Sequence, residues 1–305
     1  MSKVAFLYPG QGAQMSGMGK DFYENSSLAK DIYDKASEAL GLDMRTLCFE
    51  ENDKLDLTEY TQAALVTTCL AMTRAAKEAG LDADITAGLS LGEYAAIAAA
   101  GGMKELDAIR LVRKRGILMQ NTVPAGEGAM CAVMAMDAEK IEQVIKDIEG
   151  VSVANYNCPG QIVITGWKMA VEKAAEALKE AGAKRTIMLN VSGPFHSPML
   201  IPAGEELLLE LGQVEMSPLT VPYITNVGAK KVTDISETKQ LLAKQVSSPV
   251  CWMQSMEYLI KEGVDTFIEI GPGRTLAGFM KKIDRDVKVI NIGTWEDIDK
   301  AVSAC

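Results

Sequence analysis

The pattern most suggestive of chemistry in this sequence is a serine between two glycines, Gly88-Leu89-Ser90-Leu91-Gly92. Residues 84–87 before it predict a short strand, and the alanine-rich residues 91–100 after it predict a helix that ends at Gly101-Gly102. A serine at such a sharp strand-to-helix turn exposes its hydroxyl at the edge of a sheet, where it can act as a nucleophile. The new helix also offers unpaired backbone N–H groups to an oxyanion. A serine that only caps a helix is the alternative interpretation.

A serine hydroxyl is a weak nucleophile near neutral pH and needs a general base, a task that suits the ordinary pKa of histidine. The chain contains a single histidine, His196, in the loop Gly193-Pro194-Phe195-His196-Ser197-Pro198. A histidine held in place by purely structural hydrogen bonds is the alternative. We expect folding to bring His196 within reach of Ser90.

A glycine-rich loop, Pro9-Gly10-Gln11-Gly12-Ala13-Gln14, follows the apolar run Val4–Tyr8. It does not match the nucleotide-binding motifs, because Met15 stands where the dinucleotide fingerprint has glycine and Met18 where the phosphate-binding loop has lysine. A loop of this kind at the carboxyl edge of a parallel sheet can instead present backbone N–H groups to a ligand. One of these groups, together with the N–H of Leu91, is predicted to form an oxyanion hole.

Composition and charge narrow the classes of function. The 305 residues are 48% hydrophobic and 24% charged, and 31 basic against 41 acidic side chains give a net charge of −10. This composition is typical of a globular protein with a sizeable core, and the negative charge argues against a nucleic-acid partner. No segment approaches the roughly 18–20 uninterrupted apolar residues of a membrane helix, and the N-terminus lacks the features of a signal peptide. We therefore expect a cytoplasmic protein with no membrane partner.

Six cysteines are scattered without a close pair, and together with one histidine they do not form the usual zinc-ligand spacings. A disulfide framework is not expected either. We expect the thiols to act as small buried apolar groups, at Cys48, Cys69, Cys131, Cys158, Cys251 and Cys305.

The hydrophobic periodicity predicts an α/β fold. The expected elements of the first part are a buried strand at Val4–Tyr8 and helices at residues 21–40, 59–79 and 105–120, with Thr58 or Thr61 capping the second helix. The last part predicts strands near 221–225, 265–270 and 287–291 and helices near 237–246, 250–262 and 274–282. We expect these two parts, residues 1–125 and 193–305, to form an α/β-hydrolase-like large domain with a mostly parallel sheet.

A different pattern begins after the loop at residues 122–128. The predicted strands lie at 129–136, 151–156, 161–165 and 185–190, and the predicted helices at 137–149 and 168–181. The resulting order βαββαβ is the ferredoxin-like arrangement, which can close into a compact unit by itself. We expect residues 126–192 to be an inserted subdomain.

A series of further segments accompanies these motifs along the chain. They are Thr61-Gln62-Ala63-Ala64-Leu65, Arg113-Lys114-Arg115-Gly116, Asn157-Cys158-Pro159-Gly160-Gln161, Asn226-Val227, residues 245–252 and Glu269-Ile270-Gly271-Pro272-Gly273. With the glycine-rich loop, the serine motif and the histidine loop, and in this order, the sequence closely resembles the malonyl-CoA:acyl carrier protein transacylases, the malonyl-loading enzymes of type II fatty acid synthesis. The resemblance covers nearly the whole chain.

The resemblance implies roles for individual residues. Ser90 matches the acylated nucleophile of the family and His196 its general base. The backbone N–H groups of Gln11 and Leu91 match the oxyanion hole. Arg115 matches the arginine that binds the malonyl carboxylate, although three basic residues in a row on a helix are otherwise typical of a solvated face. Gln245 matches the residue whose main-chain carbonyl orients the histidine, so no aspartate is required.

The implied reaction is a ping-pong transfer of malonyl from malonyl-CoA to the phosphopantetheine thiol of acyl carrier protein through a malonyl-serine intermediate, with neither a metal nor a redox cofactor. We expect a monomer. Two basic pairs, Lys184-Arg185 and Lys281-Lys282, are candidates for docking the acidic carrier. Leu89 stands where the family usually has histidine, and Phe195 resembles the malonyl-selective form, which favours malonyl over methylmalonyl.

Three other functions remain compatible with these residues. A serine hydrolase would use the same nucleophile and oxyanion hole with water as acceptor. An acyltransferase of a polyketide pathway would use the same chemistry with a different carrier. An inactive acyl-binding scaffold would form no covalent malonyl adduct.

Overall fold

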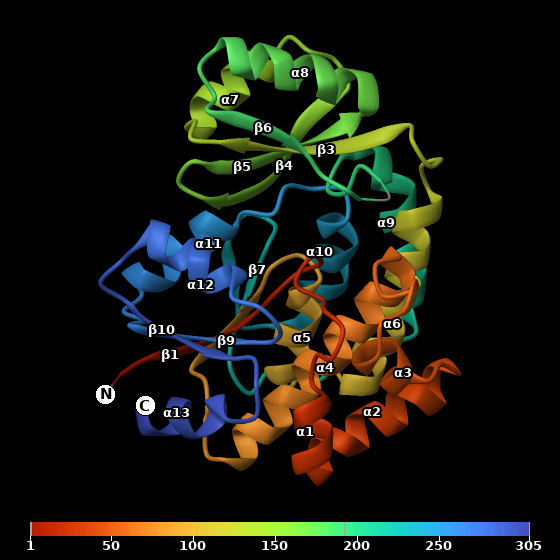
Figure 1. Cartoon of the computed structure of the whole chain (residues 1–305), viewed down its shortest axis with the longest axis vertical. Coiled ribbons are helices and arrows are strands. Elements are labelled where there is room, and N and C mark those ends of the chain that lie inside the picture. Colours follow the sequence, from red (N-terminus) through yellow and green to blue (C-terminus); the bar gives the residue numbers. More distant parts are fainter. Residues whose placement is uncertain (1, 192, 305) are drawn as a thin grey trace.

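The computed structural model describes residues 2–191 and 193–304, and the chain forms a mixed α/β structure with two sheets (Figure 1). The larger sheet has the strand order β10-β9-β1-β2-β7-β8. Its neighbouring strands run parallel except at the edge, where β8 is antiparallel to β7. The strands are β1 (Val4–Tyr8), β2 (Ile85–Gly88), β7 (Tyr223–Thr225), β8 (Lys230–Val232), β9 (Thr266–Ile270) and β10 (Lys288–Ile292). The predicted mostly parallel sheet is confirmed.

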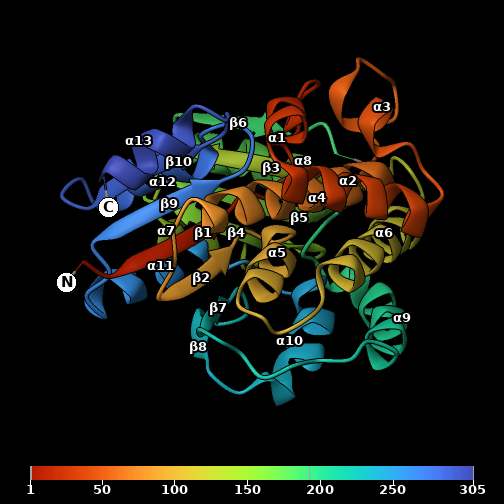
Figure 2. The ribbon, with the colours of Figure 1, turned by 90° about the horizontal axis from the view of Figure 1, so that it is seen from below.

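Helices cover both faces of this sheet, which explains why its central strands are almost entirely apolar. Alternate residues of β1 point to opposite faces: Phe6 and Tyr8 join the larger core cluster, while Ala5 and Leu7 join the second cluster. The long helices of the first cluster include α2 (Ser27–Leu40), α4 (Thr58–Glu78), α5 (Gly92–Ala99) and α6 (Glu105–Asn121). Those of the second are α11 (Trp252–Lys261) and α12 (Thr275–Ile283). Figure 2 shows β9, β1, β2 and β7 side by side with α4 and α5 beside them.

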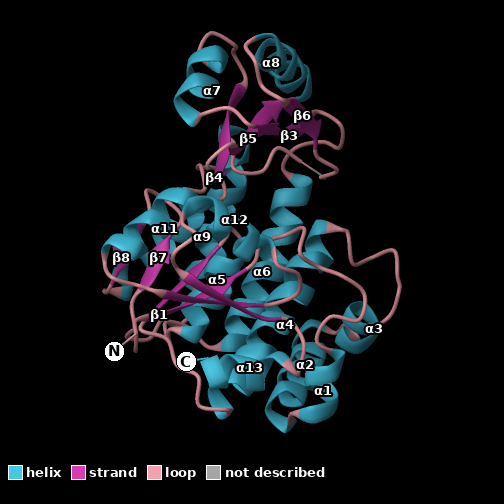
Figure 3. Cartoon of the chain, turned by 60° about the vertical axis from the view of Figure 1, so that its left-hand side comes forward, coloured by secondary structure: helices cyan, strands magenta, loops and turns pink. Residues whose placement is uncertain are grey.

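The second sheet is antiparallel, with the order β4-β5-β3-β6. Its elements are β3 (Gly128–Met134), α7 (Ala138–Ile145), β4 (Val151–Cys158), β5 (Gln161–Trp167), α8 (Lys168–Glu180) and β6 (Arg185–Met188). The helices α7 and α8 lie on the side of this sheet that faces away from the larger sheet and its helices (Figures 1 and 3). A separate apolar cluster fills the space between these helices and their sheet.

The part of the chain that contains the second sheet (the smaller unit) is joined to the part that contains the larger sheet (the larger unit) by two connecting segments of the chain. Backbone hydrogen bonds also hold the two units together. The Tyr156 N–H donates to the Val250 carbonyl over 2.9 Å, and the Val250 N–H donates to the Ala154 carbonyl over 2.8 Å. The two connecting segments also pack closely on each other, because a β-carbon on Gly128 would overlap the ring of Pro194. The last residue of the predicted subdomain, Ser192, and the chain ends Met1 and Cys305 lie outside the described residues.

The single helix expected over residues 21–40 was wrong. The chain forms α1 (Lys20–Asn25) and α2, and Ser26 between them has extended backbone (φ −126°, ψ 121°). The Ser26 side chain accepts a hydrogen bond from the Ala29 N–H over 3.2 Å. A serine that satisfies the free N–H groups of a new helix is more stable at an N-cap than inside a continuous helix.

The expected caps of α4 were also wrong, because Leu57 occupies the N-cap position and makes no side-chain cap. Thr61 instead donates its hydroxyl to the Leu55 carbonyl over 2.5 Å. The sequence analysis also missed several elements, namely α3 (Met44–Phe49), α9 (Ile201–Gly212), β8 and α13 (Asp297–Ala304). The remaining helix of the large unit, α10 (Thr238–Gln245), was expected.

Most of the expected buried thiols are confirmed: Cys48, Cys69, Cys131 and Cys158 are buried, and Cys251 is partly exposed. Cys305 lies outside the described residues. Within the described residues, no helix has the length and apolar character that crossing a membrane requires.

We predict that Gly92→Ala destabilises the protein by about 1–3 kcal/mol, because the added methyl group would overlap the Tyr8 carbonyl oxygen. Gly278→Ala is the matched control, since this exposed glycine lies inside α12 with nothing within 4 Å of the new methyl group. It should stabilise the helix by about 0.5–1 kcal/mol. Urea unfolding of both variants measures the difference, and equal effects at the two positions would contradict the close approach of α5 to β1.

Candidate active site

Ser90 occupies the turn between β2 and α5 in a left-handed backbone conformation (φ 51°). Non-glycine residues rarely adopt this conformation, so surrounding interactions must hold the turn in place. Asn226, just after β7, does so from the neighbouring strand. Its Oδ1 accepts a hydrogen bond from the Ser90 N–H over 2.6 Å, and its Nδ2 donates to the Gly88 carbonyl over 2.7 Å. The serine motif is therefore a sharp strand-to-helix turn, as expected.

The structure brings His196 to Ser90. The Ser90 Oγ lies 2.7 Å from Nε2 of His196, and the other ring nitrogen, Nδ1, lies 2.8 Å from the carbonyl oxygen of Gln245. A carbonyl can only accept, so Nδ1 carries a proton, and Nε2 of the neutral ring is free to accept the serine proton. His196 also has a left-handed backbone (φ 60°), and its N–H donates to the Val246 carbonyl over 3.1 Å.

The imidazole of His196 is neutral near pH 7. Burial lowers its pKa to about 4, and the nearby positive charge of Arg115 acts in the same direction. The hydrogen bond to the Gln245 carbonyl opposes this shift. The ring can therefore accept a proton throughout the physiological range.

Arg115 reaches the same point from α6 and is a buried cation, with 1% of its surface exposed. Its guanidinium donates to Gln62 Oε1 over 2.8 Å, to Gln245 Oε1 over 3.0 Å and to Ser90 Oγ over 3.2 Å. These acceptors are neutral, and among the described residues Arg115 has no ion-pair partner. Its Nε has no hydrogen-bond partner among them either. A carboxylate brought beside Ser90 would meet a guanidinium that makes no ion pair and has a free Nε–H donor.

The glycine-rich loop passes directly against the serine turn. A β-carbon on Gly10 would lie 2.6 Å from the Leu89 carbonyl oxygen, so only glycine permits this approach. The Gln11 side chain donates to Thr58 Oγ1 over 3.1 Å, which holds the loop to the start of α4. Within the described part of the chain, neither the Gln11 nor the Leu91 backbone N–H donates to a protein acceptor. Their role as an oxyanion hole stays a prediction.

Gln245 has more contacts than the sequence suggested. Beyond its carbonyl, its side-chain Nε2 donates to the Ser90 carbonyl over 2.9 Å and to Glu93 Oε2 over 2.6 Å. Sequence reasoning missed this amide, and it missed Gln62, Glu93 and Asn226 as parts of the site. The segments that contain Gln62 and Asn226 carried a signal through the resemblance, and Glu93 directly follows the serine motif, but their partners lie far away in the sequence.

The structure also shows the surroundings of Leu89, Phe195 and the basic pairs that the sequence analysis singled out. Leu89 packs against the apolar cluster under α11 and α12, and Phe195 is buried. Of the basic pairs, Lys282 donates to Gln161 Oε1 over 3.4 Å, so its ammonium group lies against the second unit. The use of either pair for docking a carrier stays a prediction.

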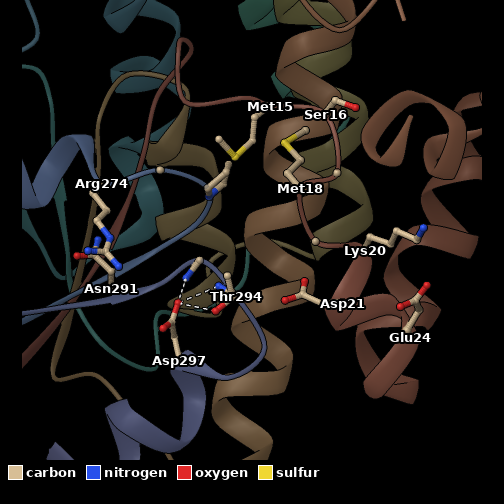
Figure 4. Close-up of a pocket in the computed structure, with 15 residues that line it drawn as sticks. Met15, Ser16, Met18, Lys20, Asp21, Glu24, Arg274, Asn291, Thr294 and Asp297 are labelled. Carbon is tan, nitrogen blue, oxygen red and sulfur yellow. Dashed lines mark hydrogen bonds between the residues drawn. The ribbon is translucent and has the colours of Figure 1, made fainter. Parts of the chain in front are cut away.

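A cavity of about 600 Å³ lies beside the loops that follow β1, β9 and β10 (Figure 4). None of the six predicted site residues lines it. In its wall, Asp297 accepts hydrogen bonds from the N–H groups of Gly293 and Thr294 over 3.2 and 3.0 Å, and Asp21 accepts one from Trp295 over 2.6 Å. These carboxylates fasten the surrounding loops.

We predict that His196 titrates with a midpoint at about pH 4, and that Arg115→Ala raises this midpoint because a charge that disfavours the imidazolium has gone. The chain has one histidine, so its ring signals can be followed by NMR without ambiguity. Lys114→Ala, which removes a largely exposed charge on the same helix, should leave the midpoint in place. A midpoint near the ordinary value of about 6.5 in the unmodified protein would contradict this account.

Known proteins resemble this chain over nearly its full length. A family model described as the acyl transferase domain matches residues 5–297. The malonyl CoA-acyl carrier protein transacylase of Bacillus subtilis is 48% identical over 307 residues, covering 99% of this chain and 97% of the relative. The crystal structure of malonyl CoA-acyl carrier protein transacylase from Clostridium perfringens has 43% identity and a TM-score of 0.96, over 99% of this chain and 97% of that one.

A malonyl-transacylase solved in complex with a type II polyketide synthase acyl-carrier protein has 36% identity and a TM-score of 0.97, with 100% of each chain covered. Both the family model and these relatives match the chain almost from end to end. We conclude that the chain belongs to the acyl transferase family.

Proposed function

We propose that this protein is an acyltransferase that moves a malonyl group from malonyl-CoA to the phosphopantetheine thiol of an acyl carrier protein, supplying malonyl-carrier for fatty acid synthesis. One observation carries the proposal: the Ser90 hydroxyl lies 2.7 Å from a neutral imidazole and 3.2 Å from a buried guanidinium. The first contact provides a nucleophile with its base, and the second provides an anchor for an acyl group that ends in a carboxylate. The names of the relatives support the same substrate and carrier.

In the first half-reaction, Nε2 of His196 takes the Ser90 proton while Oγ attacks the thioester carbon. The negative charge that forms on the carbonyl oxygen is assigned to the backbone N–H groups of Gln11 and Leu91. Collapse of this intermediate breaks the carbon–sulfur bond, and His196 returns the proton to the departing coenzyme A thiolate. The Gln245 carbonyl keeps the ring in the required tautomer throughout.

The second half-reaction runs the same steps in reverse. The carrier thiol gives its proton to His196 and attacks the malonyl-serine, and the proton then returns to the Ser90 oxygen as the ester bond breaks. No other side chain of this protein has to change its protonation state. A hydrolase would use the same intermediate, and what favours transfer is Arg115, which a simple hydrolysis of esters does not require.

We also propose the finer description of the architecture and setting. The strand order of the second sheet supports an inserted ferredoxin-like subdomain at residues 126–192. The larger unit, residues 1–125 and 193–305, would then be an α/β-hydrolase-like domain. The cysteines within the described residues are free thiols, which supports a cytoplasmic location. All the proposed site residues come from one chain, which supports an active monomer.

We predict that Ser90→Ala lowers malonyl transfer by roughly 10⁴-fold or more, because the nucleophile acts as a unit with its base. Intact mass spectrometry after mixing with malonyl-CoA should show a malonyl adduct on the unmodified protein and none on the variant. Adding carrier protein should discharge the adduct faster than buffer alone. An adduct that persists in Ser90→Ala, or that water removes as fast as the carrier does, would reject the proposed reaction.

We predict that Arg115→Ala costs about 2–5 kcal/mol with malonyl-CoA, or very roughly 30- to 4,000-fold in rate, because a bidentate charge pair is lost. Acetyl-CoA has no carboxylate and should lose much less. Arg113→Ala is the control on the same helix, since Arg113 pairs with Glu59 over 2.6 Å and should affect both substrates alike. Comparing kcat/KM for the two substrates tests the idea, and equal losses in Arg115→Ala would remove the anchor.

A further inference from the structure

Glu93, three residues after Ser90, is a buried acid that the reaction above does not use. Its side chain is 0% exposed on the first turn of α5. One carboxyl oxygen, Oε2, accepts hydrogen bonds from Gln245 Nε2 over 2.6 Å and from the Asn226 N–H over 3.1 Å. The other oxygen, Oε1, makes no hydrogen bond of ordinary geometry, although the Thr225 side chain also acts on this carboxyl. A buried carboxyl with an unsatisfied oxygen is costly, and its position beside the nucleophile suggests a function.

The amide of Gln245 links Glu93 to Arg115. Its Nε2 faces Glu93 and the Ser90 carbonyl, and its Oε1 accepts from Arg115 over 3.0 Å. If the amide turned over, its oxygen would face two acceptors and its nitrogen would face a guanidinium donor. The Glu93 carboxylate and the Ser90 carbonyl together therefore fix which end of the amide meets Arg115. The two opposite charges lie one amide apart, and each acts on the pKa of the other.

We propose that Glu93 is the counter-charge of Arg115 and a selectivity-determining positioning residue, which acts through the Gln245 amide and whose charge state sets how tightly Arg115 holds an acyl carboxylate. The inference rests on the proposed function. An acyl carboxylate at Arg115 is attracted by the guanidinium but repelled by an ionised Glu93 behind it. A neutral Glu93 removes the repulsion, so Arg115 then holds malonyl more tightly. An acetyl group carries no charge and is affected much less.

The charge of Glu93 changes near neutral pH. Burial raises its pKa to about 7, and the hydrogen bonds from Gln245, Asn226 and Thr225 and the charge of Arg115 oppose the shift. Since the carboxyl is charged above this value and neutral below it, the preference for malonyl should fall as the pH rises through about 7.

The other titratable groups around Glu93 keep their charge over the same range. Tyr94 on α5 and Tyr223 on β7 have a pKa raised by burial, so both phenols stay neutral. Burial lowers the pKa of His196 to about 4, so its ring is neutral as well. Arg115 on α6 stays protonated although burial lowers its pKa. A change in selectivity near neutral pH therefore reports on Glu93.

The test compares acylation of Ser90 by malonyl-CoA and by acetyl-CoA from about pH 6 to about pH 8.5, a range that spans the titration of Glu93. Rapid quenching and intact mass give the second-order rate constant for each substrate. Their ratio cancels whatever affects Ser90, His196 or the coenzyme A moiety equally. In the unmodified protein the malonyl-to-acetyl ratio should fall about 3- to 10-fold across this range, as expected for the repulsion between two negative charges in a partly shielded site.

Glu93→Gln keeps the shape and an oxygen acceptor but stays neutral. Its ratio should be independent of pH and should match, at high pH, the higher ratio that the unmodified protein shows at low pH. Glu269→Gln is the matched control. Glu269 is also buried with a raised pKa, but its carboxylate accepts hydrogen bonds from the Leu276 and Ala277 N–H groups at the start of α12. The ratio of that variant should follow the unmodified protein.

A constant ratio in the unmodified protein would overturn the inference without any variant, so the test does not depend on the folding of Glu93→Gln. A Glu93→Gln profile that falls with pH as the unmodified one does would overturn it as well. Failure of the proposed function looks different, because neither substrate would then acylate Ser90 at any pH.

Discussion

A buried positive charge that makes no direct ion pair determines how the rest of this site is built. Moving a guanidinium out of water costs several kcal/mol unless hydrogen bonds and other charges compensate. Here the compensation comes from the two amide oxygens of Gln62 and Gln245 and from the nucleophile itself. This arrangement leaves the charge available to a substrate. The same charge helps to keep His196 neutral, so the anchor and the base depend on each other.

Gln245 connects these parts through two different groups. Its main-chain carbonyl faces His196, while its side-chain amide lies between Arg115, the Ser90 carbonyl and Glu93. A small shift at the end of α10 would therefore displace base and anchor together. Two features oppose such a shift. Gln245 and Val246 are buried, and the Val246 carbonyl accepts a hydrogen bond from the His196 N–H.

The sequence predicted the parts of the site whose chemistry depends on local spacing. The glycines around Ser90, the loop around His196 and the periodicity of the flanking segments all carry local information. Asn226, Glu93 and the Gln245 amide could not be assigned in the same way. Asn226 and Gln245 lie more than 130 positions from Ser90 and Glu93, and only the sheet order and the packing of α10 bring them together. Ser26 shows the opposite case, because a helix start was present in the sequence and a long apolar periodicity concealed it.

The pairing of β4 with Val250 gives the smaller unit a third point of attachment. Two polypeptide crossings alone would leave a free axis of rotation between the units, whereas two reciprocal backbone hydrogen bonds away from that axis oppose such a swing. Val250 lies only five positions after Gln245, whose carbonyl faces His196, so a displacement of the smaller unit would act through this short segment on the orientation of the base.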